Sequence, residues 1–108
     1  MLKVYIAGPY TKGDIAVNVR NAMELANELL EKGFYPFVPH LTHFQHLVFP
    51  QPYEKWLELD IEWLKCCNAL IRLPNESFGA DYEVKVACQE RIPTFHDKED
   101  FYRWAKKR

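Results

Sequence analysis

The chain has 108 residues, of which 48% are hydrophobic and 15% are aromatic, and its formal net charge at pH 7 is −1. This length fits one small domain, residues 1–108, and the hydrophobic content is sufficient for a globular core. A net charge near zero excludes a strong overall field, so we expect neither nucleic acid nor a membrane as a partner.

The expected elements alternate between strand and helix along the chain. In chain order they are a strand at Leu2–Ala7, a helix from about Ile15 to Lys32, a strand at Phe34–Val38, a helix at Tyr53–Lys65, a strand at Ala69–Leu73, a helix at Phe78–Glu90, a strand at Ile92–Phe95 and a helix from Asp97 to about Lys106. The strands are rich in β-branched and aromatic residues, and the helices repeat apolar residues at helical spacing. In the first helix the repeating positions are Val19, Ala22, Met23, Ala26, Leu29 and Leu30, and in the second helix they are Trp56, Leu59 and Leu64.

This alternation predicts an α/β fold, namely a single-domain, doubly wound, flavodoxin- or Rossmann-like parallel sheet of about four strands with helices on both faces. Pro36 assigns the second strand to an edge, because proline donates no hydrogen bond to a central ladder. The expected strand order is therefore 2-1-3-4. The switch point between strands one and three brings together the loops after Ala7 and Leu73, where such sheets bind ligands.

Cysteine usage and the absence of long apolar runs bear on location. Cys66, Cys67 and Cys88 form an odd set without a C-x-x-C motif, which disfavours a disulfide framework or a zinc site and favours a reducing compartment. No apolar run approaches membrane-spanning length, and Leu2–Ala7 is too short for a signal peptide. We expect a cytoplasmic protein.

The end of the first strand, Gly8-Pro9, is the first candidate for ligand binding, because glycine permits a close approach to the backbone. A simple turn explains the dipeptide equally well. The sequence there is neither a Walker motif nor G-x-G-x-x-G, so we expect no dinucleotide and no other cofactor. Ser77 and Gly79 stand at the start of the third helix. Ser77 suits a helix cap, and the same groups are able to hold a phosphate or a sugar hydroxyl.

Glu83 and Asp60 are the candidate catalytic residues. Glycosyl chemistry uses two carboxyl groups, one as a nucleophile and one to protonate the leaving group. The two side chains belong to the helices on either side of the central strand, so both are able to reach one crevice. Surface positions on amphipathic helices are the alternative.

The segment Pro39–Pro52 is a long connection that holds His40, His43 and His46. Long loops in compact domains are usually functional, and this one is too apolar for disorder, so we expect it to fold over the site. The histidine spacing matches no standard zinc pattern. We favour a lid with His43 against the ligand over a metal site, and ordinary loop packing explains any single histidine better.

Taken together, these pieces resemble the nucleoside 2-deoxyribosyltransferase-like superfamily, which includes nucleoside deoxyribosyltransferases and 2'-deoxynucleoside 5'-phosphate N-hydrolases. The resemblance extends from Val4 to about Phe95. It rests on Tyr5-Ile-Ala-Gly-Pro9, on Ala26, Leu29, Gly33-Phe34, Pro36 and Pro39, on Asp60-Ile-Glu-Trp-Leu64 with Cys67-Asn68-Ala69, and on Ser77-Phe-Gly-Ala-Asp-Tyr-Glu83 with Ala87 and Ile92-Pro93.

The resemblance implies a role for each matching residue. Glu83 corresponds to the nucleophile that forms a covalent glycosyl-enzyme, and Asp60 to the acid that helps the base leave or positions the sugar. Tyr5, Gly8 and Pro9 match the strand that lines the sugar pocket, and Ser77 and Gly79 match the loop that holds a 5'-phosphate in the hydrolases. Asp81 departs from the hydrolase pattern by adding negative charge beside that loop, which favours a sugar site around Glu83.

We therefore predict an enzyme of nucleotide metabolism that cleaves or transfers the N-glycosidic bond of a nucleoside or nucleotide, as a hydrolase or a deoxyribosyltransferase. The alternative is a nucleotide-binding or sensor module without turnover, and a third reading is metal-dependent hydrolysis through the three histidines. The resemblance also implies a homo-oligomer, a dimer or higher. Four aromatic residues are candidates for its interface, although core packing explains each as well: Trp63, Phe101, Tyr102 and Trp104.

Overall fold

A computed structural model describes all 108 residues and shows a four-stranded parallel sheet. The strands are β1 (Lys3–Ala7), β2 (Tyr35–Phe37), β3 (Ala69–Arg72) and β4 (Thr94–Phe95). Their order is β2-β1-β3-β4, which confirms the predicted order. Pro36 lies in the edge strand β2, opposite Val4 of β1, as its missing N–H requires.

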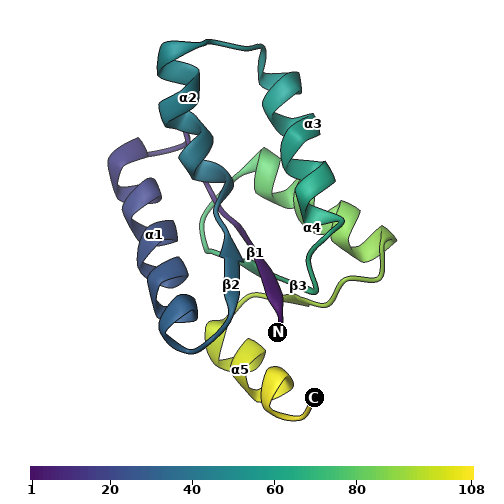
Figure 1. Cartoon of the computed structure of the whole chain (residues 1–108). Helices are drawn as coiled ribbons and strands as arrows, with labels where there is room; N and C mark the ends of the chain where they lie inside the picture. Colours follow the sequence, from purple (N-terminus) through teal and green to yellow (C-terminus); the bar gives the residue numbers. More distant parts are fainter.

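Five α-helices and one short 3₁₀-helix connect or follow the strands (Figure 1). They are α1 (Ile15–Glu31), the 3₁₀-helix η1 (Pro39–Leu41), α2 (Thr42–Val48), α3 (Tyr53–Leu64), α4 (Phe78–Gln89) and α5 (Lys98–Lys106). The N-caps predicted at Ser77 and Asp97 are confirmed, because each side chain accepts a hydrogen bond from a backbone N–H in the first turn of its helix. No helix is both long and apolar enough to cross a bilayer.

The alternation of side chains along β1 divides the core into two layers. Val4 and Ile6 point to the face covered by α1 and α5, and Tyr5 and Ala7 point to the face covered by α3 and α4. Figure 1 shows these helix pairs on opposite sides of the sheet. The helices on both faces were predicted, and they leave the carboxyl ends of β1 and β3 open for a site.

Two expectations about helices need correction. The segment Pro39–Pro52 is not a plain connection, since it contains η1 and α2. No helical pattern marks this segment, because α2 is only seven residues long and buries none of them, so it has no inward-facing apolar stripe. In α1 the buried stripe is Ala22, Leu25, Ala26 and Leu29, whereas Met23 and Leu30 are exposed, as is Leu59 of α3.

Phe101 belongs to the core and not to an interface. Its side chain is fully buried and packs edge-on against Phe34 and Phe95. Its neighbour Tyr102 donates a hydrogen bond of 2.5 Å to Glu28 of α1, which attaches α5 to the α1 layer. Trp63, by contrast, is half exposed.

We predict that Phe101→Ala lowers the free energy of unfolding by about 3–5 kcal/mol, because the substitution removes a fully buried ring. Urea denaturation followed by circular dichroism measures this change. Phe49→Ala is the matched control, since Phe49 is largely exposed and its loss should change stability by only about 0.5 kcal/mol. Equal effects of the two substitutions would contradict the assignment of Phe101 to the core.

Candidate active site

A cavity of about 860 Å³ lies beyond the carboxyl ends of β1 and β3, and we call it the site cavity. It includes six of the residues predicted for the site, namely Gly8, His43, Asp60, Ser77, Gly79 and Glu83. Its other lining residues are Tyr10, Thr11, Lys12, Pro39, His40, Thr42, His46, Gln51, Tyr53, Trp56, Leu57, Glu76, Phe78, Ala80 and Asp81. The sheet topology thus gathers segments that are far apart in the sequence, as the switch-point argument requires.

A hydrogen bond from Tyr5 holds the side chain of Glu83 in place. Glu83 lies in the second turn of α4 and is only 6% exposed, and the fully buried Tyr5 donates a hydrogen bond from its hydroxyl to Oε2. Burial raises the pKa of Glu83 to about 8, with the nearby Asp60 adding to the rise. The Tyr5 hydrogen bond and the charge of Arg72 act in the opposite direction, toward the carboxylate. The second oxygen of Glu83 has no partner in the chain.

Asp60 is the second buried carboxyl of the site cavity. It lies on α3, is 9% exposed and has no hydrogen-bond partner, and its Oδ1 is enclosed. Burial alone raises its pKa to about 7. Asp60 has no neighbour that stabilises its charged form, and burial retains its proton up to near neutral pH, although the pKa of Glu83 is raised further.

Gly8, Gly79 and Pro9 contribute to the packing around the cavity. A Cβ on Gly79 would lie 2.9 Å from the Tyr53 hydroxyl, and a Cβ on Gly8 would lie 3.0 Å from Cβ of Leu73. A side chain at Gly79 would require the end of the Tyr53 side chain to move, and one at Gly8 would require Leu73 to shift slightly, so each glycine permits close packing of the cavity wall. Pro9 does not line the cavity, and its carbonyl accepts a hydrogen bond of 2.9 Å from Nε2 of His40.

An ion pair between the buried Arg72 and Asp81, which lines the site cavity, was not foreseen. Arg72 ends β3, is buried, and donates to Oδ1 of Asp81 at 2.9 Å and to the carbonyl of Leu73. The sequence contains a signal for this pair, namely a single cation, Arg72, within an apolar strand. A buried guanidinium needs an acidic partner. A second, exposed pair at 2.8 Å joins Lys12 to Glu76 across the two loops.

The three histidines have separate partners. Nε2 of His40 donates to Pro9, His43 shares a hydrogen bond with the Tyr10 hydroxyl, and Nδ1 of His46 accepts a 2.8 Å bond from Nε1 of Trp56. The structure contains no group of three or more histidine, cysteine or acidic side chains that could hold a metal ion. The histidines instead attach η1 and α2 to the neighbouring elements, so this segment forms one wall of the site cavity.

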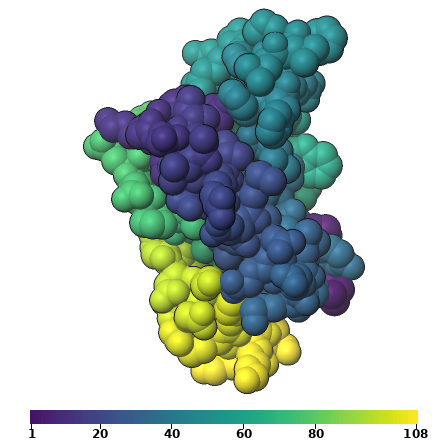
Figure 2. Space-filling view, turned by 90° about the vertical axis from the view of Figure 1, so that its left-hand side faces the viewer, coloured from purple at the N-terminus to yellow at the C-terminus, as the bar shows by residue number.

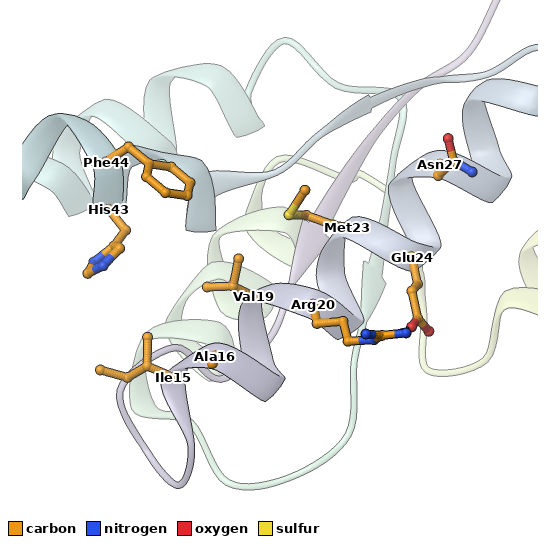
Figure 3. Close-up of a pocket in the computed structure, with 9 residues that line it drawn as sticks. All are labelled: Ile15, Ala16, Val19, Arg20, Met23, Glu24, Asn27, His43 and Phe44. Atoms are coloured by element: carbon orange, nitrogen blue, oxygen red, sulfur yellow. The ribbon is translucent and has the colours of Figure 1, made fainter.

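A second hollow of about 710 Å³ lies outside the site, between α1 and α2, and we call it the α1 groove (Figure 3). Its lining residues are Ile15, Ala16, Val19, Arg20, Met23, Glu24, Asn27, His43 and Phe44. His43 is the residue that lines both hollows.

The fold resembles that of known 2-deoxyribosyltransferases. The enzyme from Bacillus psychrosaccharolyticus matches with a TM-score of 0.68 and 15% identity, over 85% of this chain and 69% of that one. The enzyme from Leishmania mexicana matches with a TM-score of 0.65 and 17% identity, over 87% of this chain and 62% of that one. The chain therefore has a nucleoside 2-deoxyribosyltransferase-like fold, as its sequence motifs indicated, and spans about two thirds of these proteins.

The chain belongs to a family described as a domain of unknown function, DUF7768, whose model matches residues 2–97. A comparison with curated proteins found no match.

The two raised pKa values predict that stability falls as pH rises from about 5 to 8. The carboxyls of Glu83 and Asp60 have ordinary pKa values of 4.5 and 3.8, so in this range the folded state binds more protons than the unfolded state. Their contribution is complete below the ordinary values and is lost as pH passes the raised ones. Urea denaturation at several pH values measures it.

Glu83→Gln should flatten this pH dependence, because the amide does not titrate. Glu58→Gln is the matched control, since Glu58 is exposed on α3 and should leave the dependence as in the wild type. Identical slopes in the wild type and Glu83→Gln would contradict a raised pKa at Glu83.

Proposed function

We propose that residues 1–108 act as one nucleoside 2-deoxyribosyltransferase-like domain that cleaves or transfers the N-glycosidic bond of a nucleoside. The observation that carries this proposal is the pair of buried carboxyls, Asp60 and the Tyr5-bound Glu83, in one cavity at the switch point. The similarity in fold to proteins named as 2-deoxyribosyltransferases supports the same class of reaction.

In the first step, the free oxygen of the Glu83 carboxylate attacks the anomeric carbon. The bond from this carbon to the base nitrogen breaks, its electron pair passes to the nitrogen, and protonated Asp60 supplies a proton to the departing base. Tyr5 keeps the carboxylate oriented, and its hydrogen bond favours the charged form of Glu83. This step requires the Glu83 carboxylate beside protonated Asp60, the reverse of the order of their pKa values in the chain alone. The positive charge that develops on the sugar next to Glu83 favours that arrangement.

In the second step, water or another base attacks the anomeric carbon of the glycosyl-enzyme and releases Glu83. The proton of the attacking group returns to Asp60, which restores the starting state. Two inversions at one carbon give overall retention of configuration. Hydrolase and transferase outcomes differ only in the attacking group.

We further propose that the substrate carries no 5'-phosphate. The two cations next to the cavity are already paired with acids that line it, Arg72 with Asp81 and Lys12 with Glu76. The N-terminus of α4 attracts anions through its free N–H groups, but Asp81 in its first turn offsets that attraction. A phosphate placed there would therefore find no unpaired cation.

A module that binds a nucleoside without turnover is the second candidate. It is favoured by the burial of Glu83, which raises its pKa to about 8 and so opposes the carboxylate that attack requires. Nucleoside binding in calorimetry without release of free base over a long incubation would favour this candidate.

The catalytic role of Glu83 predicts that Glu83→Gln lowers the rate of base release by about 10³-fold or more, because the amide is a poor nucleophile. Chromatography of free base, after incubation with a panel of deoxynucleosides, measures the rate. Glu58→Gln should retain wild-type activity. Equal activity of the wild type and Glu83→Gln would remove Glu83 from the mechanism.

The role of Asp81 predicts that Asp81→Asn improves the binding of a deoxynucleoside monophosphate relative to its nucleoside by about tenfold, because it removes a negative charge and frees the guanidinium of Arg72. Calorimetry with both ligands gives the ratio of dissociation constants. Glu90→Gln serves as the control, since Glu90 is an exposed acid at the other end of α4. An unchanged ratio in Asp81→Asn would contradict this role.

A further inference from the structure

Helix α3 turns one stripe of side chains toward the site cavity. The stripe has the spacing of a single helix face, and all of its members line the cavity: Tyr53, Trp56, Leu57 and Asp60. Tyr53 and Asp60 are about 10 Å apart along the helix axis, at a rise of about 1.5 Å per residue. Since Tyr53 is 57% exposed and Asp60 only 9%, the stripe leads from the floor of the cavity to its rim. Figure 2 shows the teal segment that contains α2 and the start of α3 at the upper end of the molecule, above α1 in purple to blue.

The hydroxyl of Tyr53 lies against α4 at a glycine. A Cβ on Gly79 would lie 2.9 Å from this oxygen, so the absence of a side chain there gives the hydroxyl its place beside the first turn of α4. Gly79 precedes Glu83 by about one helical turn, or about 6 Å along the axis, on the same face of the helix. The Tyr53 hydroxyl and the Glu83 carboxyl therefore border the same part of the cavity.

The Tyr53 hydroxyl is neutral and makes no hydrogen bond within the chain. Its partial burial raises its pKa above the ordinary value of 10.0, and the charges of Glu83 and Asp60 add to the rise. A neutral phenol is able both to donate and to accept a hydrogen bond. Tyr10, the other tyrosine that lines the cavity, already shares its hydroxyl with His43. Tyr53 is thus the cavity tyrosine whose hydroxyl is available to a ligand.

We propose that Tyr53 is a substrate-binding residue whose hydroxyl holds a hydroxyl group of the sugar, at the 3' or the 5' position. This inference rests on the proposed function, in which the anomeric carbon lies at Glu83 and the base departs toward Asp60. Tyr53 is two turns of α3 away from Asp60, but only about one turn of α4 separates its contact at Gly79 from Glu83. Its hydroxyl therefore faces the sugar on the side away from the base. Two hydroxyls pair without a cation, which agrees with a substrate that carries no 5'-phosphate.

A binding cycle between the protein hydroxyl and the substrate hydroxyls tests this contact by calorimetry. The Glu83→Gln variant serves as the parent, so that the ligand is not consumed, and it is compared with a double variant that also carries Tyr53→Phe. The first ligands are 2'-deoxyadenosine, 2'-deoxyguanosine, 2'-deoxycytidine and thymidine. The one that binds most tightly is then compared with its 3'-deoxy and 5'-deoxy analogues.

Tyr53→Phe should weaken the binding of the deoxynucleoside about fivefold, because it removes one neutral hydrogen bond. The parent should also bind one of the two analogues about fivefold more weakly, and with this analogue Tyr53→Phe should have no further effect, because the contact is already lost. That analogue identifies the sugar hydroxyl. Tyr35→Phe is the matched control and should change nothing, since Tyr35 is 53% exposed on the edge strand β2, outside the site cavity.

The proposal is wrong if Tyr53→Phe leaves the binding of the deoxynucleoside unchanged. It is also wrong if Tyr53→Phe weakens the deoxynucleoside and both analogues equally, because the hydroxyl then acts without contacting the sugar. Absence of binding by all four deoxynucleosides would overturn it together with the proposed function. Otherwise the two claims separate. A coupled cycle without base release by the wild type would contradict only the proposed reaction, and base release with an uncoupled cycle would contradict only the role of Tyr53.

Discussion

The hydrogen bond from Tyr5 to Glu83 is the contact on which the arrangement of the site depends. It joins the middle strand β1 to helix α4 across 78 residues of sequence, inside the core layer that α3 and α4 cover. A carboxyl buried beside a second acid is unfavourable without a donor. Tyr5 supplies that donor from a fully buried position, so the core fixes where the free oxygen of Glu83 lies.

Much of the fold could be predicted from the sequence because its signals are local. Alternating strands and helices require parallel crossovers, Pro36 marks the edge strand, and Ser77 and Asp97 act as N-caps through hydrogen bonds within three residues. The gathering of Asp60 and Glu83 in one cavity follows from the same reasoning, since the switch point brings together the segments that flank β3.

The other features depend on contacts that no local pattern encodes. Arg72 within an apolar strand indicates that a partner is needed, but only the fold, in which the end of β3 meets the start of α4, shows that the partner is Asp81. The helix α2 buries no residue, so it lacks the apolar periodicity by which helices are recognised. Met23 fits the apolar periodicity of α1 yet lies on the uncovered side, where the structure leaves an apolar groove.

The central claim is that Glu83 forms a covalent bond to the sugar, and trapping this intermediate tests it most directly. A nucleoside with fluorine at C2 of the sugar slows release, because fluorine disfavours the developing positive charge. Mass spectrometry should then show the intact protein heavier by one sugar unit, with the added mass on the peptide that contains Glu83. Release of free base with no adduct, or an adduct on another residue, would contradict the account.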